Sequence, residues 1–218
     1  SWLDFEFDVK DLLYFRVDRK KKILVSTLLL ALGFNKSDMV NEFYDKEVYN
    51  FDNKLKKWKT KFNPENYKSK NFSEEIIDAK SNKIIIKKGE KINFLKAKKL
   101  HTDGLKEIYV SDQFLYGKYL VKQFSISEEI FKIGTELNET IINKCKDSNI
   151  NVLETAYTSS INKGPYLLQT IFNDKNETKN DAINEIYKVL RPGEPPTIDI
   201  ASQIFNNLFF SSDRFDLS

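Results

Sequence analysis

The sequence contains little of what most catalytic and metal sites are built from. It has one cysteine, Cys145, and one histidine, His101, among 218 residues. A single cysteine excludes an internal disulfide framework and suits a reducing compartment. A single histidine excludes a histidine-based metal cluster, or a Ser-His-Asp triad, assembled from this chain alone. We therefore expect Cys145 to be a small core residue and His101 to be a helix-end or surface residue.

Glycine is also scarce, with seven residues in total, and neither GxxxxGK[ST] nor GxGxxG occurs. A glycine-rich loop that cradles phosphates is therefore not expected. No apolar run approaches the roughly 20 residues that a membrane span needs. Carboxylates are abundant, but no spacing singles out an acid/base pair. We expect no catalysis by the chain itself. Because it begins Ser-Trp without a methionine, we also expect a segment of a longer protein.

Charge is distributed unevenly along the chain. Residues 46–111 carry seventeen lysines against nine acidic residues, an excess of eight, whereas the whole chain has a net charge of only +3. The remainder must therefore sum to about −5, which indicates a lysine-rich module set into a host of different charge. We predict an α+β insertion over residues 46–156, within a discontinuous, mainly helical domain formed by residues 1–45 and 157–218.

The insertion is expected to consist of short strands, turns and two helices. Its alternating or β-branched runs predict strands at 47–51, 55–59, 83–92 (interrupted by a turn), 108–110, 119–121 and 152–156. Helical periodicity predicts helices over 94–100 and 136–146, and residues 63–73 are typical of a loop.

The N-terminus of the host predicts a β-hairpin, because apolar and polar side chains alternate in residues 2–8 and again in 13–17. The apolar face is expected to hold Leu3, Phe5, Phe7, Leu13, Phe15 and Val17. The polar face or rim is expected to hold Trp2, Arg16 and Asp18.

A cationic run follows the hairpin, consisting of Arg19, Lys20, Lys21 and Lys22. Such a run is either a solvated face or a phosphate contact. Residues 24–32 are apolar nearly all round and predict a buried helix that stops at Gly33. A second helix should follow, capped by Asn35 or Ser37.

The most constrained stretch is Arg-Pro-Gly-Glu-Pro-Pro-Thr at residues 191–197, which contains three of the five prolines. Proline fixes φ and removes an amide donor, while Gly193 is free to take positive φ. Helical periodicity precedes this stretch at 182–190 and follows it at 198–210, with Thr197 as the expected N-cap. The stretch is either a stop and start signal for two helices or, in addition, a rigid support that presents Arg191.

Several of these stretches resemble the second lobe domain of the bacterial RNA polymerase β subunit, in order and spacing. They are SWLDFEFD (1–8), DRKKK (18–22), LLALGF (29–34), RPGEPPT (191–197) and FFSSDRFDLS (209–218). KIIIKKGEKI (83–92) and KGPYLLQT (163–170) are similar to the insertion inside that lobe in proteobacterial enzymes and to its exit.

The resemblance implies a non-catalytic lobe that forms one wall of the DNA cleft and contacts the single-stranded non-template DNA near the transcription start site. By this resemblance, Trp2 stacks on an unpaired base, and Asp18, Arg191 and Arg214 line or neighbour the same pocket and strand path. Aromatic stacking on bases tolerates any sequence. The catalytic Mg²⁺ ions belong to another subunit, so no cofactor is expected in this segment.

The implied partners are DNA, the β′, α and ω subunits, a sigma factor and, for the insertion, secondary-channel regulators of the DksA kind, all in the cytoplasm. The sequence also departs from the pattern. The run 19–22 has fewer arginines than related chains, and Leu24 and Leu30 replace an expected proline and arginine. Arg19, Lys20, Lys21 and Lys22 therefore remain candidate backbone contacts without an assigned bidentate geometry. The alternative is a stand-alone adaptor whose lysine-rich module recruits an acidic partner.

Overall fold

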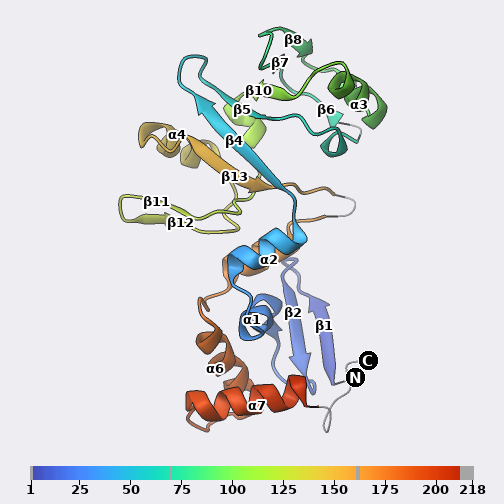
Figure 1. Cartoon of the computed structure of the whole chain (residues 1–218). Coiled ribbons are helices and arrows are strands. Elements are labelled where there is room, and N and C mark those ends of the chain that lie inside the picture. The colour runs from blue at the N-terminus through green and yellow to red at the C-terminus, as the bar shows by residue number, and fades with distance from the viewer. Residues whose placement is uncertain (1, 69, 161–162, 212–218) are drawn as a thin grey trace. The chain divides into compact units, whose positions relative to one another are not determined.

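The computed structural model describes residues 2–68, 70–160 and 163–211. The chain forms two compact units, of which unit 1 comprises Ser1–Phe43 with Gly164–Ser218 and unit 2 comprises the intervening Tyr44–Lys163. The junctions follow residues 43 and 163, whereas the composition placed them after residues 45 and 156. Both units mix helices and strands, so the predicted α+β class is confirmed (Figure 1).

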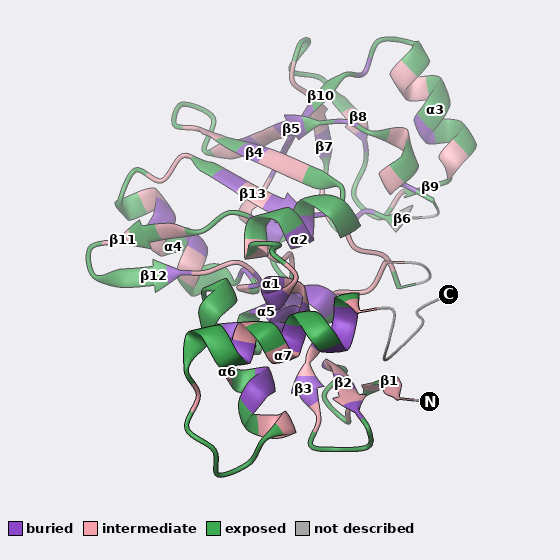
Figure 2. Cartoon of the chain, turned by 60° about the horizontal axis from the view of Figure 1, so that its bottom comes forward, coloured by how far each residue is buried: buried purple, intermediate pink, exposed green. Residues whose placement is uncertain are grey.

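Unit 1 begins with a three-stranded antiparallel sheet in the order β1-β2-β3, formed by Leu3–Phe7, Leu13–Val17 and Ile23–Leu24. Its helices are α1 (Val25–Ala31), α2 (Lys36–Phe43), α5 (Tyr166–Asn173), α6 (Lys179–Leu190) and α7 (Ile198–Phe210). α6 packs on both α1 and α7, and α1 also packs on α5. Figure 2 shows that the buried residues of these helices lie toward one another.

Local signals account for the ends of several helices in unit 1. Gly33 follows α1 with φ of +104°, so the predicted stop is confirmed. Asn35 accepts a hydrogen bond from the backbone N–H of Asp38 at 2.8 Å, which identifies Asn35, of the two candidates, as the cap of α2. Thr197 accepts from the N–H of Ile200 at 3.4 Å as the predicted N-cap of α7.

The predicted hairpin is present, but its apolar face is not buried evenly. Phe5 pairs with Phe15 across the two strands, which confirms that they share a face. Phe15 is fully buried, whereas Phe5 and Phe7 are each 57% exposed. The cause is position, because β2 is the central strand and contacts α1 and α5, whereas β1 is an edge strand.

Unit 2 is organised around a six-stranded antiparallel sheet with strand order β13-β4-β5-β10-β7-β8. In chain order the strands are β4 (Lys46–Asp52), β5 (Lys57–Lys61), β7 (Ile76–Asp78), β8 (Ile84–Ile86), β10 (Glu107–Val110) and β13 (Val152–Ala156). Two small ribbons pair β6 (Lys70–Asn71) with β9 (Lys91–Ile92) and β11 (Phe124–Ile126) with β12 (Glu129–Phe131). Its helices are α3 (Phe94–Thr102), α4 (Glu139–Asp147) and the 3₁₀ turns η1 (Pro64–Asn66) and η2 (Asp112–Leu115).

The core of unit 2 is separate and rich in aromatic side chains, with Tyr49 and Trp58 fully buried. Cys145 is also fully buried there, so the prediction of a core cysteine is confirmed. Burial raises the pKa of its thiol to about 11. His101 lies in the last turn of α3, where a helix-end residue was expected.

Two local predictions in unit 2 were wrong, and three short strands, β7, β11 and β12, were not predicted. The strand expected at 119–121 is reduced to isolated bridges, because Tyr119 and Leu120 pair with different segments, at Glu136 and Thr155. The loop expected at 63–73 contains η1 and β6, and the ribbon β11–β12 was not predicted. In each case the pairing partner lies at a distance or in a very short strand, where periodicity gives no signal.

Candidate nucleic-acid interface

The turn between β2 and β3, residues 17–20, has an unusual backbone for its sequence. Asp18 and Arg19 both have positive φ, of 46° and 58°, and the N–H of Lys20 donates to the carbonyl of Val17 at 2.9 Å. Two successive positive φ values are those of a type I′ turn, which strongly favours Asn-Gly or Asp-Gly. Aspartate tolerates this conformation, but arginine does so at a cost. The turn therefore holds two exposed charged side chains at fixed positions.

Contacts from both strands of the hairpin hold this β2–β3 turn. The carbonyl of Trp2 accepts from the N–H of Asp18 at 2.8 Å. Arg16 donates through Nη1 to the carbonyl of Lys20 at 3.0 Å, and through Nη2 to the Glu6 carboxylate, also at 3.0 Å. Arg16 thus uses its planar donor geometry to tie the turn to β1.

The stretch 191–197 forms a corner between α6 and α7. Arg191 is the C-cap of α6, and its N–H donates to the carbonyl of Tyr187 at 2.8 Å. Gly193 has φ of +81°, the conformation for which glycine was expected. Tyr187 donates to Glu194 at 3.4 Å; burial and this carboxylate raise the pKa of Tyr187. The corner is therefore fixed by local bonds as well as by its prolines.

Lys20 joins the turn to the corner. Its Nζ donates to the carbonyl of Leu190, the last residue of α6, at 2.9 Å. The last carbonyls of a helix have no partner within the helix, and a cation at that end also interacts favourably with the helix dipole. One bond between residues 170 positions apart in sequence therefore joins the β2–β3 turn to the residue that precedes Arg191.

Trp2 precedes β1 and contacts the C-terminal part of α7. Its ring packs against Phe209 of α7 with centroids 5.7 Å apart and an interplanar angle of 57°. Phe209 in turn packs on the buried Phe205 at 4.8 Å. Trp2 itself is only partly buried. In Figure 1, one end of α7 lies near the ends of β1 and β2.

Two hydrogen bonds link the segments that carry three of the four predicted DNA-binding residues, Trp2, Asp18 and Arg191, although these residues are far apart in sequence. The fourth, Arg214, lies outside the described residues. The four residues of the cationic run 19–22 make different contacts. Lys20 binds a carbonyl, Lys22 lies 4.3 Å from the centre of the Tyr14 ring, and Arg19 and Lys21 are exposed.

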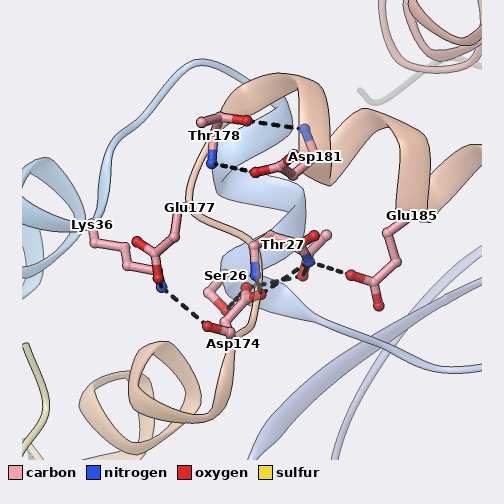
Figure 3. Close-up of polar contacts among 9 residues, drawn as sticks. Ser26, Thr27, Lys36, Asp174, Glu177, Thr178, Asp181 and Glu185 are labelled. Atoms are coloured by element: carbon pink, nitrogen blue, oxygen red, sulfur yellow. Dashed lines mark hydrogen bonds and ion pairs between the residues drawn. The ribbon is translucent and has the colours of Figure 1, made fainter. Parts of the chain in front are cut away.

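The other end of α6 is anchored by a buried polar cluster that sequence reasoning missed (Figure 3). Asp174 is 2% exposed and accepts from the hydroxyls of Ser26 at 2.5 Å and Thr27 at 2.9 Å, both on α1. Asn176 donates to Asp174 at 3.0 Å and also to Glu185 on α6. A buried carboxylate needs such hydrogen bonds to be tolerated. The cluster links α1, the loop after α5 and α6.

A capping box begins α6 in the same region (Figure 3). Thr178 accepts from the N–H of Asp181 at 3.1 Å, while Asp181 accepts from the N–H of Thr178 at 3.2 Å. Hydrogen bonds from Thr178 lower the pKa of Asp181. The Thr-x-x-Asp spacing was visible in the sequence. The burial of Asp174 was not, because its partners lie 147 and 148 residues away.

Trp2, the β2–β3 turn and the corner at 191–197 present groups that suit binding. These groups are an indole ring, exposed guanidinium groups at Arg19 and Arg191, and the Asp18 carboxylate. No group of three or more His, Cys, Asp or Glu that could hold a metal ion occurs in the described residues. Within those residues, no helix is both long and apolar enough to cross a membrane. Guanidinium groups and aromatic rings suit phosphates and unstacked bases.

Unit 2 carries a different kind of charge. Residues 83–106 contain eight lysines against two acidic residues, and no arginine occurs anywhere in the unit. Lys96 pairs with Glu90, and Lys106 donates to the carbonyl of His101 at 2.8 Å at the end of α3. Lysine attracts anions as a point charge without bidentate geometry. This basic stretch therefore favours an acidic partner without specifying its shape.

No protein-family model matches the chain. It is similar to proteins named DNA-directed RNA polymerase subunit beta, with 40% identity over 224 residues in Rickettsia massiliae. The identity is 39% over 224 residues in Rickettsia rickettsii (strain Sheila Smith) and 37% over 221 residues in Rhizobium leguminosarum bv. trifolii (strain WSM2304). Each match covers 100% of this chain but spans only 16% of the relative's length.

Proposed function

Residues 1–218 belong, along their whole length, to the DNA-directed RNA polymerase β subunit family, and from this premise we propose that they form a lobe of that subunit. In this proposal unit 1 is the second lobe domain and forms one wall of the DNA cleft during transcription. Its end that bears Trp2, Asp18 and Arg191 contacts the single-stranded non-template DNA near the start site. Unit 2 is the lineage-specific insertion.

The observation that supports the proposal is that hydrogen bonds link the segments that carry these residues. Trp2, Asp18 and Arg191 were assigned by resemblance alone, and the Trp2–Asp18 backbone bond and the Lys20–Leu190 bond join their segments. A partly buried indole ring and exposed arginines in the same unit are groups that suit single-stranded DNA, since stacking is worth about 1–3 kcal/mol per base. Arginine adds phosphate attraction and can stack on bases as well.

The proposal assigns no catalytic residue and no cofactor to this segment. Nucleotide addition and its Mg²⁺ ions belong to another subunit, and the segment works only within the assembled enzyme in the cytoplasm. Its partners are then the β′, α and ω subunits, a sigma factor and DNA. Unit 2, with its basic stretch at 83–106, is a candidate docking surface for secondary-channel regulators of the DksA kind.

The test is the lifetime of the promoter open complex in a reconstituted polymerase that carries Trp2→Ala or Arg191→Ala. Loss of one stacked base should shorten the lifetime about tenfold for Trp2→Ala. Alanine keeps the backbone carbonyl that binds Asp18, so the turn should survive. Phe34→Ala, at a 45% exposed aromatic in the same unit, and Lys188→Ala, in the last turn of α6, are matched controls.

Unchanged lifetimes for both site variants would overturn the DNA contact. The adaptor alternative is favoured by one observation, the lysine excess at 83–106. It predicts the converse pattern, in which Lys98→Glu with Lys99→Glu removes function and the two site variants do not. Both lysines are exposed on α3, so charge reversal there should leave the fold intact.

A further inference from the structure

The bond from Lys20 to the last carbonyl of α6 suggests a role that the cationic run alone does not indicate. We propose that Lys20 is a positioning residue that orients Arg191 toward the DNA strand, and that it is not itself a phosphate contact. This inference rests on the proposed function, because it assumes that Arg191 meets DNA. The four basic residues at 19–22 then have different roles, according to the groups that each one contacts.

The geometry at the end of α6 carries the inference. The carbonyl that Lys20 binds belongs to the peptide group between Leu190 and Arg191. A peptide group is planar, so holding its oxygen also fixes the plane from which the Arg191 side chain departs. Arg191 leaves the helix at φ −129° and ψ 70°, so the helix no longer determines its direction. The N–H of the same peptide group donates to the carbonyl of Tyr187 at 2.8 Å, and the Lys20 bond adds a long-range constraint on its oxygen.

Lys20 can act as a constraint because its own backbone is held. Its N–H donates to the carbonyl of Val17 at 2.9 Å, and its carbonyl accepts from Nη1 of Arg16 at 3.0 Å. Arg16 also donates to the Glu6 carboxylate. A continuous chain of contacts therefore runs from strand β1 through the β2–β3 turn to the corner. A flexible lysine on a mobile loop would not transmit position, whereas this one starts from a tight turn.

The backbone on the far side of Arg191 is equally restrained. There the Arg191 carbonyl accepts from the N–H of Glu194 at 3.3 Å. The Lys20 bond is the long-range one among these, since the others lie within the corner and α6. Its removal should therefore change the direction of Arg191 without melting the helix.

The experiment is a double-mutant cycle in the reconstituted polymerase, read as open-complex lifetime over a range of salt concentrations. Lys20→Met removes the donor but keeps an unbranched apolar stem, and Lys20→Arg restores a donor. We expect Lys20→Met to shorten the lifetime several-fold, Lys20→Arg to preserve most of it, and Lys20→Met to add no further loss to Arg191→Ala. Lys21→Met, at the exposed neighbouring position, is the matched control.

A second readout follows the positioning directly. Amide hydrogen exchange over residues 188–197 of the assembled enzyme should quicken several-fold in Lys20→Met and stay unchanged in Lys21→Met. A lysine that merely neutralises a phosphate would leave this exchange unaltered. It would instead lower the salt slope by about 0.7 and add its full loss to that of Arg191→Ala. That pattern would overturn the positioning role.

The cycle also distinguishes failure of this inference from failure of the proposed function. If Arg191→Ala leaves the lifetime unchanged, the proposed DNA contact of Arg191 is wrong, and a positioning role toward DNA is refuted with it. If Arg191→Ala shortens the lifetime but Lys20→Met does not, the DNA contact stands and the inference about Lys20 fails.

Discussion

The two units are assembled differently along the chain, since unit 1 consists of two separate segments and unit 2 of one. In unit 1 the decisive polar contacts join distant parts of the sequence, such as Lys20 to Leu190 and Ser26 to Asp174, 170 and 148 positions apart. Unit 2 is one continuous stretch with its own core and a sheet whose strands all pair antiparallel. The comparison teaches that the lysine excess and the candidate site lie in different bodies, so their roles can be tested separately.

The largest expected effect comes from destabilising the core of one unit and measuring the stability of the other. Phe205→Ala in unit 1 should destabilise that unit by about 3–5 kcal/mol, and Ile108→Ala in unit 2 should destabilise that unit by about 2–5 kcal/mol, since both side chains are at least 98% buried. Hydrogen exchange in urea would follow each unit by its own peptides. Each variant should shift only its own transition. A common transition that both variants shift would show that the units unfold as one.

A smaller effect tests whether long-range polar ties matter more in unit 1. Asp174→Ala leaves the buried hydroxyls of Ser26 and Thr27 without their acceptor and should cost about 2–3 kcal/mol. Asp112→Ala is the counterpart in unit 2, where the carboxylate accepts from Trp58 at 2.8 Å but is 25% exposed. We expect it to cost about half as much. Urea unfolding measures both, with the exposed Lys175→Ala as control.

Equal losses for the two aspartate variants would contradict the proposed difference. A loss in Asp174→Ala accompanied by faster exchange at residues 179–190 would sharpen it, because that result would show the cluster anchoring α6 as well as stabilising the core.

The smallest expected effect is a difference in alkaline stability. The folded pKa of Cys145 is raised to about 11 from an ordinary value of 9.0, and burial also raises the pKa of Tyr49. A raised folded pKa stabilises the protein below the unfolded pKa, and this contribution is lost as pH rises toward the folded value. Unit 2 should therefore lose about 1 kcal/mol between pH 9 and 10 through Cys145.

Urea unfolding at pH 8, 9 and 10 would measure this loss by the fluorescence of Trp58 in a Trp2→Phe background. Cys145→Ala should abolish most of the pH dependence at some cost in packing. In the intact protein the thiol should react slowly with a thiol reagent at pH 8. Rapid reaction under native conditions would contradict the burial on which the prediction is based.

Local chemistry made part of the fold predictable from sequence. Gly33, Thr197 and the prolines of 191–197 act on their immediate backbone, and the structure has the helix ends that they predict. The alternation in 2–8 and 13–17 predicted the hairpin that the structure has, since that pairing needs only a short turn. It did not predict the exposure of Phe5 and Phe7, because burial depends on which strand the helices cover.

The candidate site was predictable only through resemblance. Nothing local in the run 19–22 distinguishes Lys20, which binds Leu190, from the exposed Lys21, because the difference is made by a helix end 170 residues away. The same holds for Asp174. In the sequence it is one of many polar loop residues, and only the packing of α1 against it shows that it is buried. Arg214 lies outside the described residues, so its role stays a prediction.

The first and last strands of unit 2 are neighbours in its sheet, with Lys46 opposite Ala156. Just beyond this pair, the N–H of Tyr157 donates to the carbonyl of Asp45 at 2.8 Å. The entry and exit of more than half of the chain are therefore tied side by side by unit 2 itself. The entropy cost of closing a loop grows with the number of its flexible residues. Because unit 2 is folded and its ends are paired, few residues contribute to that cost. A module whose two ends meet in this way can be gained, lost or exchanged with little change to the chain around it, because unit 1 then folds as if it bridged only a short gap.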